Sequence, residues 1–104
     1  MQTDKEILRE IKRTVQEIIP DAKIFLFGSR ATGKWHEESD WDILILTKNK
    51  YPKSMKWRIF EKLLPLGNSI SSLISVIIEQ EEEWFDNAAY YALRLNVEPE
   101  KIAI

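Results

Sequence analysis

The 104-residue chain has no cysteine and only one histidine, His36. Without cysteine, neither a disulfide framework nor a thiolate metal site can form, and a lone loop histidine is usually a surface residue without a second ligand nearby. The chain also has no apolar run of membrane-spanning length and no signal-peptide pattern at its N-terminus. We therefore expect a cytoplasmic protein with no membrane partner.

The sequence has little excess of either charge. It contains 15 Lys and Arg against 17 Asp and Glu, a net charge of −2 at pH 7, and its basic residues are spread along the chain. A dedicated polynucleotide binder normally has a basic face, so we expect no nucleic-acid partner. A small nucleotide remains compatible, because a local phosphate site and a metal ion can hold it. Since the chain shows no repeat and no linker, we expect a single domain over residues 1–104.

The most informative stretch is an apolar run followed by a turn of small residues. Residues 23–27 are typical of a buried strand, and Gly28 and Ser29 end that strand. Glycine adopts backbone angles that are closed to other residues, and serine can cap a helix. A strand that turns here into a short helix, at about residues 30–32, leaves free N–H groups and the positive end of a helix dipole. This arrangement suits a phosphate group.

Two carboxylates begin the next apolar run, at residues 40–47. On a strand, residues two apart share a face, so Asp40 and Asp42 point together while Trp41 points to the opposite side. The aspartates lie beside the Gly28-Ser29 turn only if the two strands are antiparallel, because their connection is too short for a parallel crossover. Paired oxygen ligands beside a phosphate site are what Mg²⁺ and a nucleoside triphosphate require.

The remaining elements predict a small mixed β-sheet flanked by helices, an α+β fold. Thr3 and Glu6 form a capping-box pattern before apolar residues at helical spacing. We expect helices over about residues 4–18, from 54 to near Pro65 and Gly67, over 81–87 and over 87–95. We also expect a third strand within residues 71–79, and either a short edge strand or a loose tail at 101–104.

Together, the two stretches have the form G-S-R-A-x-G followed by S-D-x-D and an apolar strand. This pattern resembles the signature of the nucleotidyltransferase superfamily that includes DNA polymerase β, and more narrowly the minimal nucleotidyltransferases (MNT). The motif covers about residues 24–46, and two parts at fixed spacing are more specific than a single glycine pattern. The resemblance implies the nucleotidyltransferase fold, Mg²⁺ as cofactor and transfer of a nucleoside monophosphate.

The same resemblance implies roles for individual residues. Gly28 and Ser29 would hold the β- and γ-phosphates, and Asp40 and Asp42 would bind the metal and carry catalysis. Ser39 would either assist phosphate binding or shape the turn before the strand. Such proteins commonly occur beside a HEPN partner, a small helical RNase-like toxin, and some attach AMP to a partner tyrosine. We therefore expect ATP as the donor, with a HEPN-type protein or a second copy of the chain completing the acceptor site.

One position departs from the family pattern. The family's third carboxylate comes from a later neighbouring strand, and Ser75 stands at the matching place. Serine is a poor metal ligand and cannot alone act as a general base at neutral pH. Glu79 shares the strand face but is roughly 13 Å further along, so it would substitute only in another register.

The motif and Ser75 are compatible with three functions. The first is AMP transfer to a protein hydroxyl, and the second is an impaired subunit that binds a HEPN-type partner. Transfer to a small molecule ranks last, because aminoglycoside nucleotidyltransferases usually add a helical domain for the acceptor.

Several other side chains have two interpretations each. Arg30 would contact phosphate or lie exposed on its helix, and Trp35 would stack on a base or cover its loop. We expect the other aromatic residues of interest to pack in the core or at an interface: Trp41, Trp57, Trp84, Tyr90 and Tyr91.

Overall fold

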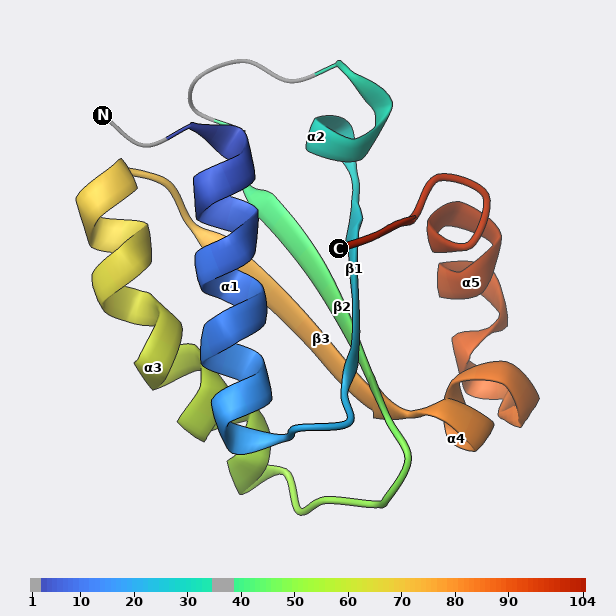
Figure 1. Cartoon of the computed structure of the whole chain (residues 1–104). Helices are drawn as coiled ribbons and strands as arrows, with labels where there is room; N and C mark the ends of the chain where they lie inside the picture. The colour runs from blue at the N-terminus through green and yellow to red at the C-terminus, as the bar shows by residue number, and fades with distance from the viewer. Residues whose placement is uncertain (1–2, 35–38) are drawn as a thin grey trace.

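The computed structural model describes residues 3–34 and 39–104, and it contains a four-stranded sheet with helices on both faces (Figure 1). Its elements follow in the order α1 (Asp4–Ile18), β1 (Lys23–Phe27), α2 (Ser29–Thr32), β2 (Trp41–Thr47), α3 (Ser54–Ile70), β3 (Ile74–Gln80), α4 (Glu81–Asp86), a 3-10 turn (Ala88–Tyr90), α5 (Tyr91–Val97) and β4 (Ile102–Ala103). The predicted mixed α+β class is confirmed. None of the helices in these two ranges is long and apolar enough to cross a membrane.

The sheet has the strand order β3-β2-β1-β4. β1 runs antiparallel to both β2 and β4, whereas β2 and β3 are parallel. The predicted antiparallel pairing of the first two strands is confirmed. The parallel pair is possible because α3 provides the long crossover that two parallel neighbours need.

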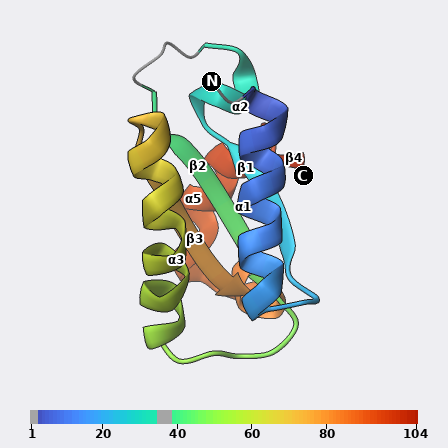
Figure 2. The ribbon, with the colours of Figure 1, turned by 60° about the vertical axis from the view of Figure 1, so that its left-hand side comes forward.

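Two helical layers cover the sheet. Figure 2 shows α1 and α3 in front of the strands and α5 behind them. Side chains alternate along each strand, so Ile43 and Ile45 pack with α1 and α3, whereas Leu44 and Leu46 pack with Trp84 and the C-terminal helices. β2 is therefore buried on both faces and forms the centre of the molecule.

Thr3 caps the start of α1, and it contacts Glu6 through its hydroxyl. The Thr3 hydroxyl accepts a hydrogen bond from the Glu6 backbone N–H at 3.2 Å, and Thr3 Oγ1 donates to the Glu6 carboxylate. Ile11 and Val15 follow on the buried side of the helix and are fully inaccessible to solvent. Helical spacing in the sequence thus corresponds to the face that packs on the sheet.

The predicted end of α3 near Pro65 and Gly67 is wrong. The helix continues through Pro65 to Ile70 and ends at Ser71, which adopts a left-handed conformation with φ of 54°. Proline removes one helical hydrogen bond, but Gly67 is buried and Leu66 and Ile70 pack against the core. Burial of the last turn therefore outweighs the local preference of the proline. The third strand, expected within residues 71–79, runs from Ile74 to Gln80, because α3 extends to Ile70.

The C-terminal region also differs from the prediction of one helix over 87–95. Asn87 is extended, and its side chain accepts a hydrogen bond from the Ala89 backbone N–H, so a new helical segment starts there. Residues 101–104 contain the predicted short edge strand, with Phe25 opposite Ala103 and Leu26 opposite Ile102.

Candidate active site

The turn after β1 brings glycine against a carboxylate. Gly28 has φ of 76°, which favours glycine, and it connects β1 directly to α2. A Cβ atom added at Gly28 would lie 2.2 Å from Asp42 Oδ2. The antiparallel register causes this approach, because Phe27 pairs with Asp42. The structure thus brings together the two parts of the motif.

The aspartates differ in their surroundings. Asp42 is half-buried on the face of β2 opposite Trp41, whose side chain is 2% exposed. Asp40 is exposed and immediately precedes the strand. Burial raises the pKa of the Asp42 carboxyl, and the negative charges of Asp40 and Glu100 raise it further. Two other carboxylates therefore act on Asp42 at this end of the sheet.

Glu100 was not predicted as part of this site. The Gly28 backbone N–H donates to Glu100 Oε1 at 2.8 Å across a separation of 72 residues. No local pattern could have indicated this contact, since residues 101–104 were expected to form an edge strand or a loose tail. Its position follows from the pairing of β4 with β1, which brings the C-terminal segment alongside the end of the first strand.

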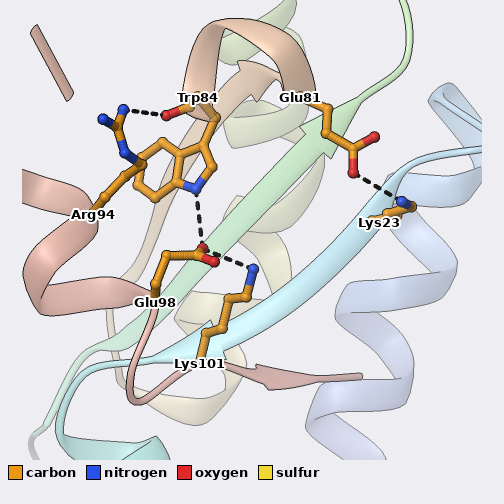
Figure 3. Close-up of polar contacts among 6 residues, drawn as sticks. All are labelled: Lys23, Glu81, Trp84, Arg94, Glu98 and Lys101. Carbon is orange, nitrogen blue, oxygen red and sulfur yellow. Dashed lines mark hydrogen bonds and ion pairs between the residues drawn. The ribbon is translucent and has the colours of Figure 1, made fainter. Parts of the chain in front are cut away.

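A set of contacts holds the C-terminal segment against α4 (Figure 3). Glu98 accepts hydrogen bonds from the buried Trp84 indole N–H at 3.0 Å and forms an ion pair with Lys101 at 2.7 Å. Arg94 donates to the Trp84 and Asn87 backbone carbonyls. These bonds fix the turn between α5 and β4, in which Glu100 lies.

Ser75 is the neighbour of Asp42 on β3. The parallel register pairs Asp42 with Ser75, while Glu79 pairs with Leu46 four positions further along. Ser75 is exposed. Glu79 therefore does not take the place beside Asp42, and the alternative register considered above is not observed.

Arg30 and Ser39 are connected to each other. The Arg30 side chain donates from Nε to the Ser39 carbonyl at 3.1 Å, and its guanidinium carbon lies 4.1 Å from the centre of the Trp41 ring. Ser39 is 8% exposed. These contacts tie α2 to the start of β2 and so support the geometry between Gly28 and Asp42. Trp35 and His36, which also had predicted roles, lie outside the described residues.

The carboxylates fit a divalent cation that arrives with other ligands. Among residues 3–34 and 39–104, no three His, Asp or Glu side chains are close enough to hold a metal by themselves. Mg²⁺ is commonly held by one or two carboxylates and completes its coordination with phosphate oxygens and water. Asp40 and Asp42 match that pattern of two carboxylates. A bound cation would also offset the repulsion between their negative charges.

A cavity of about 900 Å³ extends from this end of the sheet along β3. Its lining includes Ser75 from β3, the exposed Trp57 and Phe60 from α3, and Tyr90 from the C-terminal region. The nearby Glu79 carboxylate raises the pKa of the Tyr90 hydroxyl. The cavity therefore connects an aromatic surface to the immediate neighbour of Asp42. Of the tryptophans expected in the core or at an interface, Trp41 and Trp84 are buried, whereas Trp57 is 66% exposed and so does not lie in the core.

Comparisons with known proteins agree with this geometry. The model of the nucleotidyltransferase domain family matches residues 8–96. A protein of Methanocaldococcus jannaschii described as a candidate protein adenylyltransferase is 37% identical over 75 residues, which cover 70% of this chain and 76% of that protein.

Solved structures show a similar fold. One is a toxin–antitoxin complex with AMP-PNP, with 22% identity and a TM-score of 0.66 over 97% of this chain and 72% of that one. Another is a tri-AMPylated HEPN toxin of Shewanella oneidensis in complex with an MNT antitoxin, with 19% identity and a TM-score of 0.66 over 97% and 71%. The family match, the sequence relative and the motif together show that the chain belongs to the nucleotidyltransferase domain family.

Proposed function

We propose that this protein is a Mg²⁺-dependent adenylyltransferase that transfers AMP from ATP to a hydroxyl group of a partner protein. The observation that carries the proposal is the approach of the Asp42 carboxylate to Gly28. The Asp42 carboxylate, which we propose binds the metal, thus lies directly beside the glycine turn that we propose binds phosphate. The similarity to the candidate protein adenylyltransferase supports AMP as the transferred group.

Each residue of the motif has a role in this reaction. Gly28 and Ser29 bind the β- and γ-phosphates, and the position of Ser39 at the start of β2 helps to shape this site. Asp40 and Asp42 hold Mg²⁺, which, when bound, neutralises charge on the α-phosphate and the leaving pyrophosphate. The acceptor oxygen forms a bond to the α-phosphorus, the bond to pyrophosphate breaks, and the hydroxyl proton is released.

The acceptor is supplied by another protein. The lining of the cavity along β3 includes Ser75, next to Asp42, and aromatic side chains, of which Trp57 is exposed, and such a lining suits a protein surface. A HEPN-type partner is supported by the fold neighbour found with a HEPN toxin that carries AMP groups. In this arrangement the partner, or a second copy of the chain, would present its hydroxyl over Ser75.

Calorimetric titration of ATP with Mg²⁺ tests the nucleotide site. We expect binding by the wild-type protein and at least about tenfold weaker binding by Asp40→Asn and by Asp42→Asn, because each loses a charged metal ligand. Asp21→Asn is the matched control, since Asp21 is exposed in the turn between α1 and β1. Equal binding by all four proteins would contradict the proposed metal site.

A second candidate function rests on Ser75. If the position beside Asp42 lacks the carboxylate needed for catalysis, the protein acts by binding a HEPN-type partner and transfers nothing. Mass spectrometry of the mixed proteins with ATP and Mg²⁺ separates the two functions. The addition of AMP to the partner supports transfer, whereas a complex that forms without AMP addition and survives Asp42→Asn supports the binding role.

A further inference from the structure

The C-terminal segment places an anion on the phosphate-binding turn. Glu100 Oε1 accepts the Gly28 N–H at 2.8 Å in a partly buried setting. Asp42 Oδ2 lies against the same glycine, since it would be 2.2 Å from an added Cβ atom. Glu100 and Asp42 thus approach one backbone position from two different elements.

The negative charge of Glu100 is not neutralised by a neighbouring cation. Its sequence neighbour Lys101 pairs instead with Glu98 and lies 4.3 Å from the centre of the Phe25 ring. Within the two described ranges, no ion pair includes Glu100. Its carboxylate is therefore an uncompensated anion whose polar contact is a backbone N–H.

The segment that carries Glu100 is held on both sides of this residue. Glu98 is fixed by Trp84 and Lys101 (Figure 3). The Glu100 N–H donates to the Val97 carbonyl at 3.2 Å. Beyond Glu100, the two residues of β4 pair with β1, and Ile104 packs against the core. Rotation of the Glu100 side chain away from Gly28 would leave these contacts in place.

A carboxylate oxygen and a phosphate oxygen use the same backbone donor in the same way. Both accept a charge-assisted hydrogen bond from an N–H group, and both are repelled by neighbouring carboxylates. One N–H directed at Glu100 cannot serve a phosphate at the same time. The turn is therefore already occupied by an anion from the chain itself.

We propose that Glu100 is a specificity-determining residue that competes with the triphosphate for the Gly28 N–H and so excludes ATP that lacks a bound metal. The inference rests on the proposed nucleotide site. ATP that carries Mg²⁺ has less negative charge and gains Asp40 and Asp42 as metal ligands, so it displaces Glu100. Metal-free ATP meets three carboxylates and gains no compensating contact.

Titration of ATP into the full chain, once with Mg²⁺ and once with EDTA, tests this role. The variants are Glu100→Gln, which keeps the shape and removes the charge, and Glu100→Ala, which also removes the acceptor. Glu61→Gln is the matched control, because Glu61 is exposed on α3, on the other side of the sheet. Thermal unfolding of each variant confirms that it is folded, and the Gly28 amide resonance follows the site directly.

Both Glu100 variants are expected to bind metal-free ATP about tenfold more tightly than the wild type, with a smaller gain for ATP with Mg²⁺. Metal-free binding that is unchanged or unmeasurable in all proteins would overturn the role of Glu100. Weaker binding of ATP with Mg²⁺ by both variants would also overturn it, because Glu100 would then be a metal ligand. If no protein binds ATP under either condition, the nucleotide site itself fails and this inference fails with it.

Discussion

At the scale of single residues, Gly28 meets two separate demands. Its φ of 76° disfavours any side chain, and the space where a Cβ atom would lie is taken by the Asp42 carboxylate. Gly33 has a similar φ of 80°, but no atom of residues 3–34 and 39–104 lies within 4 Å of its added Cβ atom. The two glycines therefore allow the effect of backbone strain to be separated from that of the contact with Asp42.

We expect Gly28→Ala to lower the free energy of unfolding by about 2 to 4 kcal/mol and to abolish ATP binding, because the methyl group displaces Asp42. Gly33→Ala has only the backbone cost, about 1 kcal/mol, and should still bind ATP. Urea unfolding and calorimetry measure both effects. Equal costs for the two variants would show that the Asp42 carboxylate does not restrict position 28.

The raised pKa of Asp42 predicts that this carboxylate, which we propose binds the metal, lowers the stability of the fold at neutral pH. A carboxyl whose pKa is higher in the folded than in the unfolded protein destabilises the fold once pH rises above its usual value of about 3.9. Asp42→Asn should therefore stabilise the protein at neutral pH, by up to about 1 kcal/mol given the partial exposure of the group. This gain should disappear below the ordinary carboxyl range, where Asp42 is neutral in both states.

Urea unfolding at neutral pH and at acid pH measures this difference, with Asp21→Asn as the control. A stabilisation that is the same at both pH values would mean that it does not arise from the charge of Asp42. Binding of Mg²⁺ should strengthen as pH rises through the raised pKa of Asp42, because the metal requires the ionised carboxylate.

At the scale of elements, the regular spacing of apolar residues predicts the helices and strands better than proline and glycine predict where a helix ends. The helical spacing of α1 and the continuous apolar run of β2 correspond to buried faces, and the antiparallel direction of the motif strands follows from their short connection. The end of α3 was predicted wrongly, since proline and glycine are read as stops although the last turn is buried. Glu100 could not be predicted, because its place depends on β4 pairing with β1 across most of the chain.

The proline inside α3 leads to a prediction about stability. Pro65 is exposed and lacks the N–H that would bond to the Glu61 carbonyl, so it weakens the helix without contributing to the core. We expect Pro65→Ala to raise the free energy of unfolding by about 1 to 3 kcal/mol, measured by urea unfolding. The exposed Ser69→Ala in the same helix is the control, and no gain for Pro65→Ala relative to it would mean that the helix already accommodates the ring.

At the scale of the whole molecule, both edges of the sheet contribute to one site. The turn after β1, the start of β2 and the segment before β4 meet at the same end of the strands, and β3 brings Ser75 beside them. The helices on the two faces hold these strands in register through separate apolar clusters. In the proposed function, this end of the strands would bind the nucleotide, and a partner would supply the acceptor.

β3 is an edge strand of the sheet, and this position affects solubility. Its outer backbone groups are available to another strand, which makes such an edge a site of unwanted self-association. Lys53 and Lys56 line the cavity beside this edge and are exposed. Glu79 and Glu83 line the same cavity. Two copies that met edge to edge would bring the lysines together, so we expect the lysines to oppose that contact.

We therefore expect Lys53→Gln with Lys56→Gln to increase the sedimentation coefficient at high protein concentration. Lys5→Gln with Lys12→Gln on α1 removes the same charge elsewhere and should leave sedimentation unchanged. Equal behaviour of the two double variants would show that net charge alone governs solubility. If the β3 edge governs it, the surface proposed for a partner protein disfavours a second copy of the chain in that place.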